Sequence, residues 1–294
     1  MPKNICLITN YNYSAFITEC LEGVLSQSKP FDLVLVVDDG STDNSKFIIE
    51  SICEKNPSVK FISKENGGQL SGFNAAANLV SSDDRVFFLD ADDVYPQNYL
   101  ELVLANLSMH PADFTYSKDH LFSSARSPLT TAKSDDVSPE RVPITSALSR
   151  AASCWFGGPT SCISISGSLF QKIFPYPFEN DWKSRADDVI VYASSVIGVH
   201  KLYLPSLHIG YRTHPNNSYL NRKISLEEKD RRERALYQLF DWYASRFATQ
   251  IHPTLIQTLL EFISLSKSQR KRHAVPNPIK LTYKWLQSKQ SIKN

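Results

Sequence analysis

Apolar residues in the first 90 positions form short unbroken runs, and polar loops separate these runs. They read NICLIT (4–9), DLVLVV (32–37), VKFIS (59–63) and RVFFLD (85–90). Runs of this length are typical of strands that are buried on both faces of a parallel sheet. We therefore predict four strands in this part of the chain, each followed by a polar loop.

The segments between these runs show helical spacing. Apolar residues recur three and four positions apart between residues 14 and 28 and again from 47 to 52, and a segment of small residues follows the double glycine at 67–68. Such spacing gives each helix one apolar face. The resulting order, βαβαβαβ, predicts an α/β fold with a mostly parallel sheet, right-handed crossovers and helices on its faces.

The pattern is less regular beyond residue 110. A polar stretch rich in Ser, Thr and Pro, from about residue 117 to 141, is interpreted as a mobile connection or lid. Alternation at 163–165 predicts a strand, and a short helix is expected at 169–174. Nearer the C-terminus, a capping-box pattern at 225–228 opens one helix, and a second helix opens at Pro253.

Composition narrows the class of protein. The chain has 294 residues, of which 42% are hydrophobic and 21% charged, as in ordinary globular proteins. A net charge of +2 gives no reason to expect nucleic-acid binding. The five cysteines include no C-x-x-C pair, so we expect buried free thiols in a reducing compartment. The first residues do not read as a signal peptide, and no run approaches the ~20 apolar residues of a membrane span, so we expect a cytoplasmic protein.

Acidic and polar residues gather where the predicted strands end, at 9–12, 38–39 and 90–93. Ligands of open α/β sheets bind outside the carboxyl ends of the strands, so these clusters are expected at one ligand-binding edge. In VVDDGSTDNS, a carboxylate can accept the N–H of a nucleotide base. Asp38 or Asp43 can equally satisfy amides of the turn and the following helix, and the residues alone leave both interpretations open.

The segment LDADD places three carboxylates, Asp90, Asp92 and Asp93, within four positions. Hard divalent cations such as Mg²⁺ and Mn²⁺ take oxygen ligands, and substrate phosphates complete their coordination shell. Acids spaced D-x-D at a strand end can place one carboxylate on the cation and another on a ribose. The alternative, a helix N-cap, explains Asp93 well and Asp90 poorly.

Several segments occur in an informative order: TNYN, VVDDGSTDNS, ENGGQLSGFNAAA and VFFLDADDVYPQNYLE, then GPTSCISISGSLFQKIFP, RADDVIVYASSVIG and YRTHPNNS. They resemble family 2 glycosyltransferases with the GT-A fold, closely over about the first 105 residues. The last two look like the family's Glu-Asp segment and its Tyr-Arg-x-His element. The resemblance implies transfer of a sugar from a nucleotide-sugar, most commonly UDP-linked, to a hydroxyl acceptor with inversion at the anomeric carbon.

The resemblance also implies a domain organisation. A GT-A domain would cover residues 1–220, with a nucleotide-sugar-binding half at 1–110 and an acceptor half at 111–220. A C-terminal helical extension with a basic tail would cover 221–294. Transfer of the family's functional residues to this sequence gives a donor site in which Thr9 and Tyr11 line the base.

Within that donor site, Asp39 would hydrogen-bond the base, with Asp38 the weaker candidate, and Asp90 would contact the ribose or the metal. The main ligand of Mn²⁺ or Mg²⁺ would be Asp92. His214 would be an additional metal or diphosphate contact, although a lone histidine is more often a surface or packing residue.

The catalytic base implied by the family is Asp188, with Asp187 at the position that the family usually fills with Glu. Acids at a helix start can also serve only as caps, and this alternative is compatible with catalysis. Phe73 stands where the family often has an Arg ahead of Asn74, so one polar contact to the donor is expected to be missing. Both departures leave open a catalytically silent nucleotide-sugar-binding module. A nucleotidyltransferase or NAD-dependent enzyme is disfavoured, because no G-x-G-x-x-G follows the first strand.

The segment from Lys267 onward is basic and carries interspersed apolar residues, Leu281, Tyr283, Trp285 and Leu286. It can rest on an anionic membrane surface, at the inner face of the membrane, and this would suit a lipid-linked oligosaccharide acceptor. Solvated helix ends followed by a disordered terminus are the alternative. A saccharide acceptor is equally compatible with the sequence.

Overall fold

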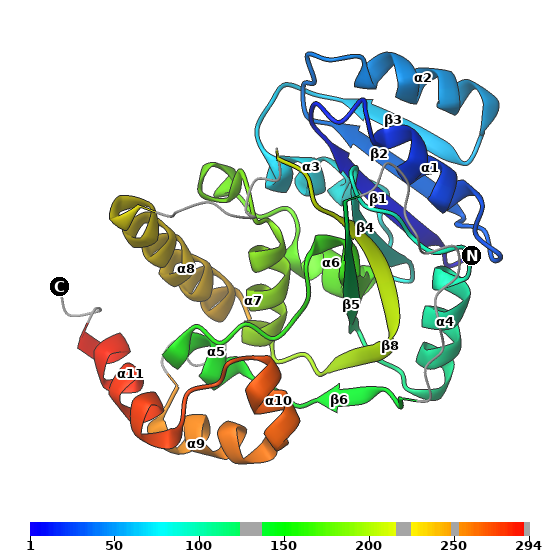
Figure 1. Cartoon of the computed structure of the whole chain (residues 1–294). Helices are drawn as coiled ribbons and strands as arrows, with labels where there is room; N and C mark the ends of the chain where they lie inside the picture. Colours follow the sequence, from blue (N-terminus) through cyan, green and yellow to red (C-terminus); the bar gives the residue numbers. More distant parts are fainter. Residues whose placement is uncertain (124–136, 216–224, 248–252, 291–294) are drawn as a thin grey trace. The chain divides into compact units, whose positions relative to one another are not determined.

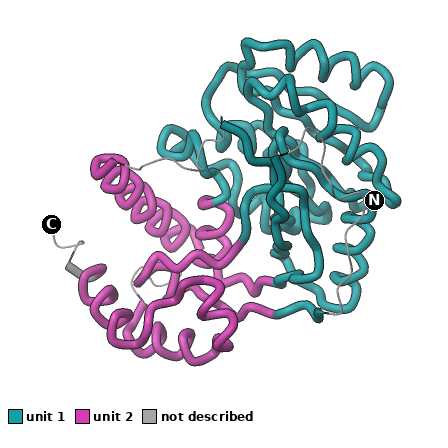
Figure 2. The backbone as a smooth tube through the Cα atoms, viewed as in Figure 1, with its two compact units in different colours: residues 1–140, 158–187, 202–223 teal, residues 141–157, 188–201, 224–294 magenta. Residues whose placement is uncertain are grey.

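The chain is described by a computed structural model over residues 1–123, 137–215, 225–247 and 253–290 (Figure 1). It divides into two compact units (Figure 2). Unit 1 comprises residues 1–140, 158–187 and 202–223, and unit 2 comprises residues 141–157, 188–201 and 224–294. The domain boundary expected at residue 220 lies outside the described residues.

The described strands form one eight-stranded sheet in the order β3-β2-β1-β4-β7-β5-β8-β6. Strands β3, β2, β1 and β4 are parallel, whereas β7 is antiparallel to β4 and to β5. The mostly parallel sheet is thereby confirmed, and its first four strands are those that the apolar runs predict. The strand bounds are β1 Asn4–Asn10, β2 Leu33–Asp38, β3 Val59–Ser63, β4 Arg85–Asp90, β5 Phe114–Phe122, β6 Glu140–Val142, β7 Ile163–Ser166 and β8 Lys201–Arg212.

A helix follows each of the first four strands, and the helical spacing predicts the first three of these helices. In the N-terminal part these are α1 Ile17–Leu25, α2 Ser45–Lys55, α3 Gln69–Ala75 and α4 Tyr99–Met109. The later helices are α5 Ser146–Ala152, α6 Gly167–Ile173, α7 Asp187–Ile197, α8 Leu226–Arg246, α9 Leu255–Ser264, α10 Lys267–Arg272 and α11 Pro278–Gln290. Short 3-10 turns occur at Ala77–Leu79, Thr160–Cys162 and Glu179–Trp182.

Both faces of the parallel strands are covered, which explains why the apolar runs lack alternation. Successive residues of a strand point to opposite faces. In β4, Phe87 and Leu89 join a core with residues of α1, α2 and α4. Phe88 points the other way, and its ring lies 4.9 Å from that of Phe73 in α3 and 6.2 Å from that of Phe170 in α6 (centroid distances).

The interpretation of residues 117–141 as a mobile connection is wrong at both ends. Residues 114–122 form β5, of which the first three pair with β7, and residues 140–142 form β6. The side chains at 118–121 are exposed, so the strand continues there without the apolar alternation that would have revealed it. Residues 124–136 of this stretch lie outside the described residues.

Unit 2 contains the C-terminal helices. The predicted N-terminus of α8 is confirmed, since Ser225 Oγ accepts the amide of Glu228 at 3.1 Å. The helix buries an apolar stripe that includes Leu236, Leu239, Phe240 and Tyr243. In the described part of the chain, no helix combines the length and the apolar character that crossing a membrane requires.

Candidate active site

The carboxylate of Asp38 accepts hydrogen bonds from the end of β1 and from the loop that follows β2. It accepts hydrogen bonds from Asn10 Nδ2 at 2.7 Å, from Ser41 Oγ at 2.6 Å and from the Ser41 amide at 3.0 Å. The residue is 1% exposed. Asp38 therefore satisfies the turn, as one of the two interpretations of this segment expects.

The neighbouring Asp39 organises the loop that leads into α3. Its carboxylate accepts the amides of Gly67 at 2.9 Å and Gly68 at 2.7 Å and the ammonium of Lys64 at 2.8 Å. Ser71 Oγ lies at 3.3 Å. Three of these groups lie on Oδ1, whereas Oδ2 accepts the Gly68 amide. Each carboxylate oxygen can accept about two hydrogen bonds, so Oδ2 can accept a further N–H.

Gly68 is held in a conformation and a space that only glycine fits. Its φ is +88°, and an added Cβ would lie 2.8 Å from the carbonyl oxygen of Lys183 and overlap that residue's Cα. We expect Gly68→Ala to lower the free energy of unfolding by about 2–4 kcal/mol, because its φ of +88° and ψ of 170° lie in a region that glycine alone adopts readily, and because of this clash. Thermal unfolding followed by circular dichroism measures the effect.

Gly198→Ala is the matched control for this substitution. Its φ of +85° is also positive, but an added Cβ would meet nothing within 4 Å. We therefore expect the control to lose only the strain contribution, about 1–2 kcal/mol. Equal losses of stability in the two variants would show that Lys183 does not restrict Gly68.

The two residues expected beside the base differ in exposure. Thr9, at the end of β1, is 9% exposed, and its Cγ2 lies so close to Gly72 of α3 that an added Cβ would be 2.9 Å from it. Tyr11 is 46% exposed. Of these two, Tyr11 therefore has the more accessible side chain for contact with a ligand.

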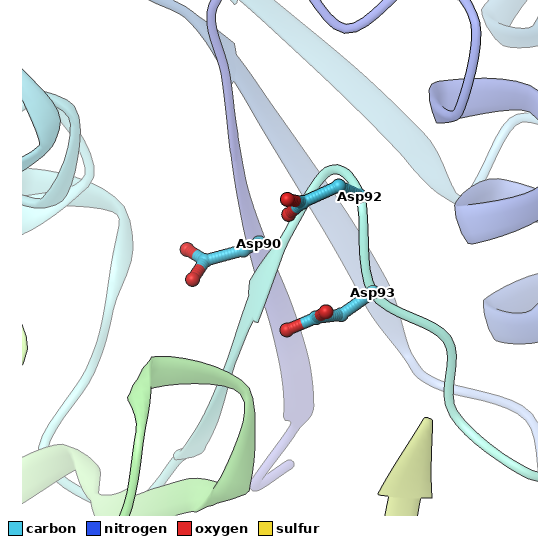
Figure 3. Close-up of side chains that lie close together, drawn as sticks. All are labelled: Asp90, Asp92 and Asp93. Atoms are coloured by element: carbon cyan, nitrogen blue, oxygen red, sulfur yellow. The ribbon is translucent and has the colours of Figure 1, made fainter. Parts of the chain in front are cut away.

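Three carboxylates, from the last residue of β4 and from the turn after it, project to the same side (Figure 3). One oxygen from each of Asp90, Asp92 and Asp93 lies within 4.8 Å of the others. Burial, followed by the charge of Asp92, raises the pKa of both Asp90 and Asp93 well above the ordinary carboxyl value. Like charges placed this close and this deeply destabilise one another unless a cation or bound donor compensates them.

Other parts of unit 1 orient these acids. Asp93 accepts Ser161 Oγ at 2.5 Å and the Arg212 amide at 2.9 Å. Asp92 Oδ2 lies 2.9 Å from His214 Nε2, and the imidazole packs on the ring of Phe16 at 4.8 Å. His214, predicted as a metal or diphosphate contact, therefore contacts the predicted main metal ligand.

Arg212 is a buried cation at this site whose contacts the sequence left unassigned. Its Nε donates to the carbonyl of Asp92 at 2.9 Å, and its Nη2 pairs with Glu19 at 2.5 Å. The guanidinium also lies 4.4 Å from the ring centroid of Phe122. In the sequence, only its place in the YRTH element indicated that Arg212 belongs to the site. Its pairing with Glu19, 193 residues away, cannot be predicted from the sequence.

Gln69 is a second residue that the sequence did not single out. Its Nε2 donates to Asp90 Oδ1 at 2.6 Å, and its Oε1 accepts the amide of Ala186 at 3.2 Å. The backbone amide of Gln69 also donates to the carbonyl of Lys183 at 3.0 Å. Gln69 thus connects the acid cluster to the segment that leads into α7. No sequence pattern distinguishes this glutamine from a solvent-exposed one.

The two acids at the start of α7 have different surroundings. Asp187 is half-buried. The pKa of Asp90 is raised first by burial, then by the charge of Asp92 and then by the charge of Asp187. Asp188 is 0% exposed and pairs with Arg232 of α8 at 2.7 Å, within unit 2. Asp187 therefore lies near the acid cluster, whereas Asp188 is bound to a C-terminal helix.

Phe73, the departure from the family pattern, is a core residue. It is 0% exposed, and its ring lies 4.9 Å from Phe88 and 5.8 Å from Phe174 (centroid distances). The substitution of an expected polar residue by phenylalanine therefore fills the apolar layer between α3 and the sheet.

The sheet order and the α/β layers are those of the GT-A fold, with acids at the strand ends. Residues 5–134 match the model of the family described as Glycosyl transferase family 2. An uncharacterized glycosyltransferase of Nostoc sp. is 27% identical over 254 residues, which cover 83% of this chain and 75% of that protein. The resemblance to family 2 glycosyltransferases that the motifs indicate is thus supported by the family model over residues 5–134 and by this relative.

Solved structures share this fold. TarS of S. aureus in complex with UDP-GlcNAc superposes with a TM-score of 0.62 at 18% identity, covering 97% of this chain and 79% of that chain. The mannosyltransferase PcManGT of Pyrobaculum calidifontis, in complex with GDP-Man and Mn²⁺, gives a TM-score of 0.53 at 14% identity, covering 98% and 87%. At these identities the similarity establishes the fold, and the GT-A expectation is confirmed.

Proposed function

We propose that this glycosyltransferase transfers a sugar from a UDP-linked donor, with inversion and with the help of a divalent cation, to a hydroxyl of a saccharide or lipid-linked acceptor. The observation that carries the proposal is the set of three carboxylates within 4.8 Å at the ligand-binding edge of the sheet. A UDP donor is supported by the fold shared with TarS, which is solved with UDP-GlcNAc.

The proposed donor site lies at the ends of β1, β2 and β4. Tyr11 and Thr9 line the base, and Asp39 accepts its N–H. We propose that the base N–H binds Asp39 Oδ2, which accepts the Gly68 amide, while Lys64 stays on Oδ1. Asp90 would contact the ribose or the cation. Asp38 keeps its position in the turn.

The acid cluster fits a divalent cation, because it offers hard oxygen donors from three carboxylates that lie within 4.8 Å of one another. Asp92, together with Asp90, would hold Mn²⁺ or Mg²⁺, which as a Lewis acid stabilises the charge on a leaving diphosphate. Asp93 is held by Ser161 and Arg212 and shapes the turn. His214 orients the carboxylate of Asp92 through their 2.9 Å contact.

We favour Asp187 over Asp188 as the general base. Inversion by a single displacement requires a carboxylate that can take the proton of the acceptor hydroxyl. Asp187 is partly exposed and near Asp90, whereas Asp188 is fully buried and paired with Arg232. In this assignment Asp188 anchors the start of α7 to α8, and the ion pair keeps the helix start in place.

Calorimetric titration of UDP, with and without Mn²⁺, tests the proposal. We expect binding that requires the cation and disappears with EDTA, because the diphosphate and the acid cluster repel one another without it. Turnover of a UDP-sugar with release of UDP, and NMR of the product anomer, then test transfer and inversion. Binding without turnover of any donor would support a catalytically silent binding module instead. No UDP binding in either condition would contradict the UDP assignment.

A further inference from the structure

Helix α9 of unit 2 carries large apolar side chains on its exposed face. Ile256, Leu260 and Ile263 are 71%, 61% and 71% exposed. Their spacing, i, i+4 and i+7, places them in one stripe along the helix. Thr258, on the other side of the helix, is 0% exposed. A soluble helix ordinarily has the opposite arrangement, so this face is built to contact something apolar.

Helix α11 repeats the arrangement. Ile279, Tyr283 and Leu286 have the same i, i+4, i+7 spacing and are 83%, 62% and 49% exposed. Leu281, on the other side, is 0% exposed and holds the helix on unit 2. The two helices belong to one unit and are joined by a hydrogen bond from Trp285 Nε1 to the carbonyl of Pro253 at 2.8 Å.

The apolar stripes occur in the most basic part of the chain. Residues 253–294 contain eight Lys and Arg against one acid, a net charge of +7. Since the whole chain carries +2, the other 252 residues carry −5. The single acid, Glu261, accepts the amides of Ala147 at 3.0 Å and Leu148 at 2.8 Å, so it caps α5. Exposed basic residues lie in α10, between the two striped helices in the chain, and in α11 itself; they are Lys267, Lys271, Arg272, Lys280 and Lys284.

We propose that the exposed apolar stripes of α9 and α11, with the basic residues around them, form a docking surface for a bilayer that contains anionic lipids. Apolar side chains in such a surface enter the boundary between headgroups and acyl chains, while Lys and Arg reach lipid phosphates. A second copy of this chain fits less well, because two strongly basic faces repel one another. The proposal does not depend on the donor site.

Docking on a bilayer would bring the enzyme to a lipid-linked acceptor. An enzyme held on the surface by helices that lie in the interface meets a lipid-linked substrate in two dimensions, without crossing the membrane. The sequence indicates only a basic tail as the membrane contact. The structure identifies six exposed apolar residues, in α9 and α11, that would make the contact. Three of these, Ile256, Leu260 and Ile263, precede the basic tail.

Vesicle flotation of the full chain tests the surface. The vesicles contain phosphatidylcholine alone or mixed with phosphatidylglycerol, at low and high salt. We expect binding to the anionic vesicles that weakens with salt, since exposed charges are screened. The triple variant Ile256→Ser, Leu260→Ser, Ile263→Ser should lose at least about tenfold in vesicle affinity, because three inserted side chains are removed.

The matched control replaces three equally exposed apolar residues of unit 1: Phe47→Ser, Leu79→Ser and Met109→Ser (68%, 42% and 76% exposed). We expect the control to bind vesicles like the wild type. Failure of the wild type to bind anionic vesicles at low salt would overturn the proposal, as would equal binding by both triple variants. Dimerisation that only the α9 variant loses, without vesicle binding, would assign the surface to a second copy. UDP titration of the same variants reports on the donor site separately.

Discussion

Asp187→Asn is expected to lower kcat by about 10²- to 10⁴-fold while leaving UDP affinity within about twofold of the wild type. The magnitude is that of a lost general base, since asparagine has the shape of the carboxylate but cannot take a proton. Asp187 lies close enough to Asp90 to raise the pKa of that acid further. Steady-state turnover of the active UDP-sugar and calorimetric titration of UDP measure the two quantities.

Asp188→Asn supplies the contrast. This substitution leaves Arg232 without its buried anionic partner, and we expect a loss of about 1–3 kcal/mol in the free energy of unfolding. The cost is smaller than that of a fully buried pair because the Arg232 side chain is 29% exposed and can be rehydrated. If Asp188→Asn abolishes turnover in a fully folded protein while Asp187→Asn keeps it, the base is Asp188, as the family pattern alone implies.

Asp92→Asn is expected to remove cation-dependent UDP binding and to lower kcat/KM on the order of 10²- to 10³-fold, comparable with the loss of one strong electrostatic contact to a transition state. The substitution removes the negative charge but keeps an oxygen within reach of His214. It also removes a charge that raises the pKa of Asp90 and Asp93, so the folded protein should not become less stable. UDP titration with Mn²⁺, donor turnover and thermal unfolding check the three statements.

Asp83→Asn is the matched control for Asp92→Asn. Asp83 is an exposed acid that precedes β4, whereas Asp92 follows the same strand at its other end. We expect this control to bind UDP and Mn²⁺ like the wild type. Unchanged cation-dependent binding in Asp92→Asn would place the cation elsewhere and remove the main support for a site at the LDADD turn.

The sequence was sufficient for the parts of this protein that depend on local patterns. Strands β1 to β4 and the helices between them follow from runs and spacings of apolar residues, because burial on two faces or one leaves a periodic trace. The edge on which the acids gather follows from the rule that ligands bind at the carboxyl ends of parallel strands. By contrast, the extension of β5 through 118–121 was missed, because exposed polar residues leave no such trace.

The division of roles among the acids was decided only in three dimensions. Asp38 and Asp39 are adjacent in sequence, yet one fixes a turn and the other holds the loop of Gly67 and Gly68. Asp187 and Asp188 are also adjacent, yet a helix start turns them to different surroundings. Sequence alone assigned each pair by resemblance, because adjacent acids look alike until their partners are known.

By itself, the sequence determined the α/β fold, the resemblance to family 2 glycosyltransferases and the edge of the sheet at which the acids gather. These depend on periodicity and on short motifs, which a single chain segment contains in full. The tertiary structure decided which acids are paired and which cations contact them; Arg212 and Lys64 are examples. It also decided which apolar residues of α9 and α11 remain exposed. The physical reason is that pairing and exposure depend on contacts between distant segments, whose free energies no local pattern records.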